Sequence, residues 1–204
     1  MIPDRAKSAR SKGFDEGYYR RFYTSRRTRV QGPREVAELC ARALLQIKWA
    51  GGEVLTALDV GAGPGLWRDW FARQRPAVKY RSTDVSEYAC ARYGHERRDI
   101  TTWRARAKFD LVICQGVLPY LPRAGVVAAI ENLAVMSRGF LYLEAVTRRD
   151  LAELCDTEKT DDGMERHPGA LYRKHVQKHF MSLGFGLWIK RAAALRLYEL
   201  ERGP

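Results

Sequence analysis

The chain has 204 residues, a length that suits one domain with a complete α/β core. Its 36 Lys and Arg residues outnumber 24 Asp and Glu residues, which gives a formal net charge of +12. We find no apolar run of transmembrane length and no signal-peptide pattern, because residues 1–29 are polar and basic. The four cysteines lack C-x-x-C spacing, so neither a zinc site nor a disulfide framework is indicated. We expect a soluble, cytoplasmic protein with reduced thiols and no metal.

The start of the chain is basic and rich in aromatic residues. Arg and Lys strongly outnumber Asp and Glu there. Residues 17–23 combine aromatics and arginines too densely for a disordered tail. Residues 1–13 are expected to be flexible. The ordered part has two interpretations, a lid in which Tyr18, Tyr19, Phe22 or Tyr23 covers a ligand, or a helix that packs its aromatics on the core. A nucleic-acid-binding arm is a third, although arginines are spread through the whole chain.

Residues 33–75 predict a helix, a strand and a second helix. Apolar residues at three- and four-residue intervals indicate a helix over 33–49, with Pro33 in its first turn. A short apolar run from Val54 to Val60 indicates a buried strand, and residues 66–75 indicate an amphipathic helix. Glycines fill the turn between the strand and the second helix, where the backbone bends sharply and a ligand can approach closely.

The spacing of these glycines bears on the ligand. A dinucleotide-binding turn has the pattern G-x-G-x-x-G beneath a pyrophosphate. Here Gly61, Gly63 and Gly65 form G-x-G-x-G, and the bulky Trp67 follows. Asp59 at the strand end places an anion beside the loop, which repels phosphate and suits the amino group of an amino-acid ligand. The pattern therefore disfavours a dinucleotide.

The stretch Leu58-Asp59-Val60-Gly61-Ala62-Gly63-Pro64-Gly65 resembles the first motif of class I S-adenosylmethionine-dependent methyltransferases. The pattern of the family extends over about residues 35–200, although only this motif is specific. The resemblance implies a three-layer α-β-α sandwich with a mostly parallel seven-stranded sheet that ends in a reversed, antiparallel hairpin. It also implies S-adenosyl-L-methionine as cofactor and S-adenosyl-L-homocysteine as product. We divide the chain into an N-terminal basic and aromatic lid segment, 1–32, and a methyltransferase domain, 33–204.

Two carboxylates follow the next two predicted strands. Residues 78–83 predict a strand that ends at Asp84, where a carboxylate can accept the hydrogens of both ribose hydroxyls of an adenosine. The alternative role of Asp84 is to cap a helix over 86–93. A short strand at 95–98 leads to Asp99 and Ile100, and the resemblance places an acidic residue there beside the adenine amino group.

The second half of the chain predicts the rest of the sheet. Strands are expected at 109–114 and 140–146, with a helix over 124–137 between them that stops at Gly139. Residues 150–166 predict a short helix and an exposed insertion that walls a substrate site. A helix over 171–183 is expected to stop at Gly184, and strands at 186–190 and 194–199 form the terminal hairpin. Gln115-Gly116-Val117-Leu118 replaces the Asn/Asp-Pro-Pro-Tyr/Phe tetrad common in nucleic-acid amino methyltransferases.

These patterns give two sets of candidate residues. The predicted cofactor-binding residues are Asp59, Gly61, Ala62, Gly63, Gly65, Asp84, Val85, Asp99, Ile100, Gln115, Tyr18 and Tyr23. Residues that could act as a base on a methyl acceptor are His175, His167 and Glu144. His175 and His179 lie four residues apart, but the Glu of an H-E-x-x-H zinc site is missing.

Three classes of function remain open. The first is direct in-line methyl transfer to an oxygen or nitrogen nucleophile of a small molecule or peptide, favoured by a compact domain without a recognition module. The second is an RNA methyltransferase, for tRNA or rRNA, that uses the basic N-terminal segment. The third is a non-catalytic binding protein with a cofactor fold, which the intact glycines and Asp84 disfavour. The oligomeric state cannot be read from the residues, and no membrane partner is expected.

Overall fold

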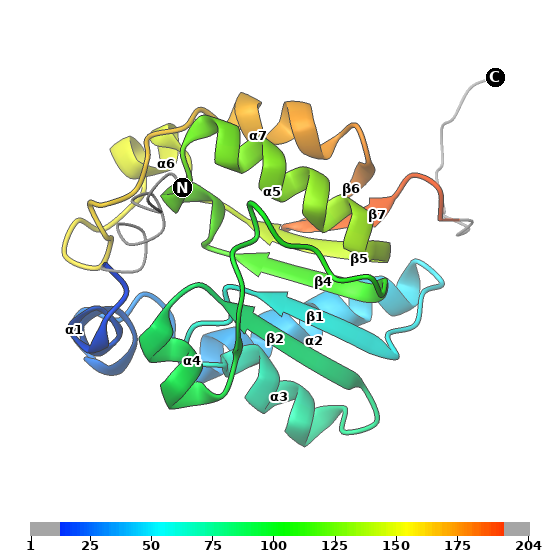
Figure 1. The fold of residues 1–204 in the computed structure, drawn as a ribbon, viewed down its shortest axis with the longest axis horizontal. Helices are drawn as coiled ribbons and strands as arrows, with labels where there is room; N and C mark the ends of the chain where they lie inside the picture. The colour runs from blue at the N-terminus through cyan, green and yellow to red at the C-terminus, as the bar shows by residue number, and fades with distance from the viewer. Residues whose placement is uncertain (1–12, 194–204) are drawn as a thin grey trace, which may run out of the picture.

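A computed structural model describes residues 13–193 of the chain. A seven-stranded sheet with the order β3-β2-β1-β4-β5-β7-β6 forms the middle layer, with helices on both faces (Figure 1). All strand pairs from β3 to β5 are parallel, whereas β7 runs antiparallel to both β5 and β6. The expected three-layer sandwich with a mostly parallel sheet and a reversed hairpin is therefore confirmed.

The strands are short, and the central ones are buried on both faces. Their bounds are β1 Thr56–Val60, β2 Lys79–Asp84, β3 Glu96–Arg97, β4 Phe109–Gln115, β5 Ser137–Glu144, β6 Phe180–Gly184 and β7 Leu187–Lys190. β1 lies between β2 and β4, with Val60 in register with Thr83 and Cys114. The carboxyl ends of these three strands therefore meet at one edge of the sheet, where open α/β sheets bind ligands.

Two apolar clusters cover the two faces of the sheet. The larger helices are α2 Pro33–Trp49, α3 Leu66–Gln74, α4 Glu87–Tyr93, α5 Arg123–Met136 and α7 Gly169–Val176. α2 and α3 bury Ile47 and Phe71 against one face, and α5 and α7 bury Ile130 and Val176 against the other. α4 lies on the same side as α3, beside β2 and β3 (Figure 1). Burial of these apolar side chains on both faces is the main stabilising contribution to the fold.

The short elements lie at the carboxyl edge of the sheet or near it. They are α1 Glu16–Tyr19, the π-helix η1 Arg20–Thr24, the 3₁₀ helix η2 Leu118–Tyr120 and α6 Arg148–Glu153. The Asp15 side chain accepts from the N–H of Tyr18 at the start of α1, and Thr147 and Asp150 cap α6 reciprocally. None of the helices in residues 13–193 is long and apolar enough to cross a membrane.

The terminal hairpin lies earlier in the chain than predicted. The helix expected over 171–183 ends at Val176, and residues 180–184 form strand β6. Gly184 is therefore not a helix stop. It begins the turn to β7 together with Phe185 and Gly186, all three at positive φ. The strand predicted at 194–199 falls outside the described residues.

Gly139 also has a different role from the one expected. α5 ends at Met136 and β5 begins at the next residue, so Gly139 lies inside a strand and stops no helix. A Cβ atom on Gly139 would lie 2.8 Å from the carbonyl oxygen of Asp110. The register between β4 and β5 shifts beside Asp110. Glycine is needed there because the two backbones approach closely at this irregularity.

Candidate cofactor and acceptor site

The glycine loop between β1 and α3 has a backbone that most side chains would strain. Gly61, Gly63 and Gly65 have φ values of 71°, 55° and 79°. A Cβ atom on Gly61 would lie 2.3 Å from Cγ2 of Val117, so both the backbone angle and the space require glycine there. Near Gly63 the space is more open, and its closest neighbours are the Tyr19 ring at 3.8 Å and the Tyr23 hydroxyl at 4.0 Å.

The N–H groups of this loop donate within the protein. Those of Gly61 and Ala62 both donate to the carbonyl oxygen of Thr83, at 2.8 and 3.0 Å. The N–H of Gly63 donates to Oδ2 of Asp84 at 2.9 Å. A phosphate-binding loop instead leaves such N–H groups free to face the anion. The N–H groups of Gly61, Ala62 and Gly63 are therefore not free to face a pyrophosphate, in agreement with the glycine spacing.

Asp84 and His95 hold Gly63 from both sides. Asp84 is 5% exposed, and its other oxygen accepts from the N–H of Ser86 at 2.8 Å. His95 Nε2 lies 2.9 Å from the carbonyl oxygen of Gly63, and its Nδ1 lies 2.8 Å from the Ser82 hydroxyl. A carbonyl oxygen can only accept, so Nε2 carries the hydrogen and Nδ1 accepts from Ser82. Burial, the largest cause, lowers the pKa of His95, which keeps the ring neutral.

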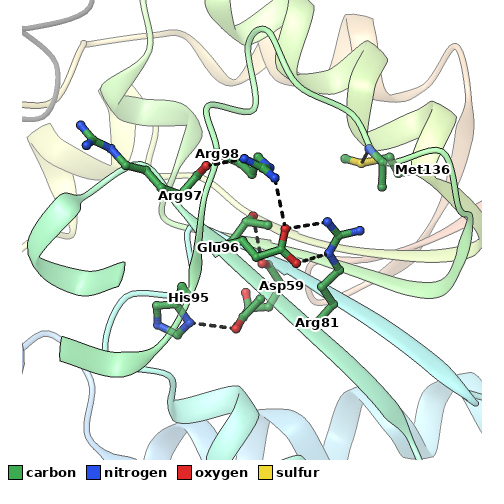
Figure 2. Close-up of polar contacts among 10 residues, drawn as sticks. Asp59, Arg81, His95, Glu96, Arg97, Arg98 and Met136 are labelled. Atoms are coloured by element: carbon green, nitrogen blue, oxygen red, sulfur yellow. Dashed lines mark hydrogen bonds and ion pairs between the residues drawn. The ribbon is translucent and has the colours of Figure 1, made fainter. Parts of the chain in front are cut away.

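Figure 2 shows how the short strand β3 is fixed beside this contact. Glu96 lies between Arg81 and Arg98 and pairs with both guanidinium groups, at 2.6 Å and 3.5 Å. His95, the residue just before β3, points toward the neighbouring strand β2, where its bond to Ser82 is drawn. These ion pairs are partly exposed, so each contributes at most about 1 kcal/mol. Their effect is to anchor the strand that positions His95.

A cavity of about 370 Å³ opens at the carboxyl edge of the sheet. One end is lined by Gly61, Gly63, Asp84, Asp99 and Ile100. The rest of the wall comes from distant parts of the chain, namely Phe14, Tyr18, Tyr19, Tyr23, Val117, Tyr120, Leu121, Asp161 and Gly163. Its volume lies within the range of about 300–1,000 Å³ typical of small-molecule sites.

A second cavity, of about 90 Å³, lies next to the first, because both are lined by Gly61, Gly63 and Gln115. Asp59 and Glu144 add two carboxylates to its wall. Asp59 is 2% exposed, and Oδ2 accepts from the Tyr80 hydroxyl at 2.6 Å. Burial, the largest cause, raises the pKa of Asp59 to about 7, and the negative charge of Asp84 adds to the rise.

Gln115 at the end of β4 connects several groups around the two cavities. Its Oε1 accepts from the indole N–H of Trp67 at 2.8 Å, and its Nε2 donates to Gln31 at 2.7 Å. The same amide nitrogen lies 3.3 Å from Oε2 of Glu144. These bonds fix the orientation of the amide. Gln115 therefore ties the residues before α2 to the ends of β4 and β5.

Residues 13–32 of the N-terminal segment pack at the carboxyl edge of the sheet. Tyr19 and Phe22 are buried, and Tyr19 stacks on Tyr88 of α4 at 5.5 Å between ring centroids. The hydroxyl groups of Tyr18 and Tyr120 lie 3.0 Å apart, and the Ser86 hydroxyl donates to the carbonyl of Phe14. Several of these rings also line the larger cavity. The segment thus packs on the domain and forms one wall of the cavity at the same time.

The structure brings most of the predicted cofactor-binding residues together. Those lining the larger cavity are Gly61, Gly63, Asp84, Val85, Asp99, Ile100, Gln115, Tyr18 and Tyr23. Asp59 and Ala62 line the smaller one. Gly65 lines neither and begins α3 in a left-handed conformation. The capping role considered for Asp84 belongs to Ser86, whose hydroxyl accepts from the N–H of Ala89 at 3.0 Å.

Of the three predicted bases, Glu144 lines the smaller of these two cavities, and His167 and His175 line neither. The Glu144 carboxylate accepts from the Tyr142 hydroxyl at 3.0 Å. His167 is buried, and its Nε2 bonds to the carbonyl oxygen of Leu121 at 2.8 Å. His175 lies on α7, near the charges of Lys174, Lys178 and Glu131. In the described part of the chain, neither histidine is among the residues of either cavity wall.

Sequence reasoning did not single out Phe14, Val117, Tyr120 and Asp161, all of which line the larger cavity, nor His95. Two signals could have found some of them. Val117 and Tyr120 lie in the loop after β4, at the carboxyl edge where open α/β sheets bind ligands, and Asp161 lies in the insertion expected to wall a substrate. Phe14 and His95 carried no local signal, because their roles come from contacts with residues far away in the sequence.

No family model matches the chain, and neither does any curated protein. Solved structures do match. The N-methyltransferase NodS from Bradyrhizobium japonicum WM9, in complex with S-adenosyl-L-homocysteine, aligns with a TM-score of 0.56 and 16% identity, over 78% of this chain and 87% of that one. Magnesium protoporphyrin IX methyltransferase (ChlM) from Synechocystis PCC 6803, with bound S-adenosylmethionine, aligns with a TM-score of 0.55 and 16% identity, over 78% of this chain and 79% of that one.

DesVI from Streptomyces venezuelae also aligns, with a TM-score of 0.55 and 15% identity, over 79% of this chain and 90% of that one. At these identities the similarity establishes the fold. The strand order, the reversed hairpin and the glycine loop after β1 agree with it. The chain therefore has the fold of the class I S-adenosylmethionine-dependent methyltransferases.

Proposed function

We propose that this protein is an S-adenosylmethionine-dependent methyltransferase that transfers the methyl group directly to a nucleophilic oxygen or nitrogen of a small molecule or peptide. The observation that carries the proposal is the pair of adjacent cavities lined by the glycine loop, Asp84, Asp99 and the aromatic N-terminal segment. Two of the similar structures contain S-adenosylmethionine or S-adenosylhomocysteine, and one of them is a methyltransferase of magnesium protoporphyrin IX.

The residues present fit the cofactor. A carboxylate can accept about four hydrogen bonds, so the two from Gly63 and Ser86 leave Asp84 able to accept from ribose hydroxyls. Asp59 and Glu144 in the smaller cavity suit the ammonium group of the amino-acid end. Asp99 lies on the wall of the larger cavity with Ile100, where an adenine amino group would be received.

The bound cofactor supplies a methyl group that is already electrophilic, because it is attached to a positively charged sulfur. The protein then has to position the acceptor in line with that bond and exclude water. Tyr18, Tyr19 and Tyr23 line the larger cavity on the side of the N-terminal segment, and this position supports a role as a cover. Burial raises the pKa of all three hydroxyls, so the cover stays uncharged.

Calorimetry with S-adenosylmethionine, S-adenosylhomocysteine and NAD tests this function. We expect binding of the first two and none of NAD, since the N–H groups of Gly61, Ala62 and Gly63 already have acceptors within the protein. Binding of NAD without binding of either sulfur ligand would overturn the assignment. Labelled methyl transfer from S-adenosylmethionine to fractions of a cell extract then tests turnover, and the absence of transfer to any fraction would favour a non-catalytic binding protein.

A further inference from the structure

The cavities have a charge opposite to that of the protein. The chain carries a formal net charge of +12, yet the described residues lining the two cavities include Asp59, Asp84, Asp99, Glu144 and Asp161 and no Lys, Arg or His. Carboxylates around a partly enclosed cavity favour a cation and disfavour an anion, because field lines concentrate within low-dielectric walls. The lining therefore disfavours phosphate and carboxylate acceptors, although the net positive charge of the whole protein would favour them.

The fit of the cofactor accounts for four of these carboxylates and leaves Asp161 unassigned. Asp161 lies in the insertion between α6 and α7, and its Oδ1 accepts from the N–H of Gly163 at 3.0 Å. Two acids of the insertion have cationic partners, since Asp156 pairs with Lys159 and Glu158 with Arg27. Asp161 forms no ion pair with any residue in 13–193, and its side chain interacts with the Tyr120 hydroxyl and the N–H of Gly163. Its carboxylate lines the larger cavity, where a cationic ligand group could contact it.

Aromatic rings line the cavity together with Asp161. Phe14 meets Tyr18 and Tyr120 edge to face, with ring centroids 5.0 Å apart in both pairs. Burial raises the pKa of Tyr18 and Tyr120, and the charge of Asp161 adds to the rise in both. The two phenols therefore stay neutral and cannot serve as bases at neutral pH. Aromatic rings beside a carboxylate form a typical binding site for an ammonium group.

We propose that the methyl acceptor is an amine, bound as its ammonium form among Phe14, Tyr18 and Tyr120 and beside Asp161. This inference rests on the proposed methyltransferase function and narrows its acceptor to nitrogen. An ammonium has no lone pair, so it first gives a proton to water. The nitrogen lone pair then forms the new N–C bond while the bond between the methyl carbon and sulfur breaks, and its electron pair stays on sulfur.

Binding of three matched probes tests the inference without turnover. 2-Phenylethylamine, 2-phenylethanol and phenylacetate share a phenyl ring and differ in the charge of the end group. Titrated into the full-length protein with and without S-adenosylhomocysteine, the amine should bind at least about tenfold more tightly than the alcohol, and phenylacetate most weakly. The absence of a preference for the amine, including no binding by any probe, would overturn the proposal.

Asp161→Asn should reduce the preference for the amine over the alcohol to about threefold or less. Asp162→Asn is the matched control, because it removes the same charge from the neighbouring exposed residue, which lines neither cavity. The control should keep the full preference. Equal effects of the two variants would show that the charge acts from a distance, and Asp161 would lose its proposed role.

The two proposals fail in different ways. If S-adenosylhomocysteine does not bind, the methyltransferase function fails, while the probe titration without it still reports on the amine site. If labelled methyl groups are transferred, mass spectrometry of the products identifies the atom that received them. N-methylated products support the inference. O-methylated products or methylated RNA would support the methyltransferase function but contradict the proposed amine acceptor.

Discussion

The ionised form of Asp59 should destabilise the ligand-free protein at neutral and higher pH, although the same charge would favour binding of an ammonium group. The carboxyl group is 2% exposed at the end of β1, and burial raises its pKa from the ordinary 3.8 to about 7. The folded state therefore binds a proton more tightly than the unfolded chain does. By linkage, the contribution of Asp59 to the free energy of unfolding is greatest below pH 3.8 and falls as pH rises from 3.8 to about 7.

The magnitude follows from that difference. Between 3.8 and about 7 the pKa differs by about 3 units, and at roughly 1.4 kcal/mol per unit the cost at pH 8.5 is on the order of 4 kcal/mol. Asparagine cannot ionise and can still accept from the Tyr80 hydroxyl. Of the full cost, roughly 3 kcal/mol arises between pH 5 and pH 8.5, so the stability of Asp59→Asn relative to wild type should increase by about that amount over this range.

Urea unfolding at the two pH values measures the effect, with Asp162→Asn as an exposed control whose stability relative to wild type should stay constant. Calorimetry provides the second measurement. An ammonium ligand group favours the ionised carboxylate, so wild-type affinity for S-adenosylhomocysteine should fall as pH drops below about 7, and Asp59→Asn should lose both affinity and this pH dependence. A stability difference that does not change with pH would show that Asp59 is not the buried acid inferred here.

Three further predictions follow from the same site. Gly61→Ala should abolish binding of S-adenosylhomocysteine in calorimetry, because its Cβ would meet Val117 at 2.3 Å and displace the loop; unchanged affinity would contradict this geometry. Asp84→Ala should lower the free energy of unfolding in urea by about 1–3 kcal/mol and weaken affinity as well, since two buried N–H groups lose their acceptor; a loss of affinity alone would argue against the loop contacts. Deletion of residues 1–32 should leave a folded core by circular dichroism yet lower turnover, and a salt-dependent loss of tRNA binding in a filter assay would instead support a nucleic-acid arm.

The sequence predicted the part of the site that depends on local chemistry. Gly61 and Gly63 could be identified because positive φ and close approach require glycine, and Asp84 because it follows the next strand in the parallel sheet. The positions of these residues depend on a strand, the turn after it and the register with the neighbouring strand, all of which have signals in the local sequence. These residues do line the larger cavity together.

The end of the sheet could not be predicted in the same way. Between Gly169 and Gly184 there is no Gly or Pro to mark where α7 ends, and a short run such as residues 180–183 fits either a helix or a strand. Pairing of Phe180 with Lys190 and of Met181 with Ile189 decides the outcome, and these pairs depend on tertiary structure. Asp161 and Tyr120 are likewise brought to one wall by contacts between distant segments.

The hydrogen bond between Trp67 and Gln115 makes the indole an intrinsic fluorescent probe of the site. Trp67 is buried at the wall of the smaller cavity, and its N–H donates to an amide that lines both cavities. Indole emission depends on the polarity and the hydrogen bonding around the ring. A ligand that forms a hydrogen bond with Gln115 should therefore change the fluorescence of Trp67. Binding at the site can then be followed in real time without a label on either substrate.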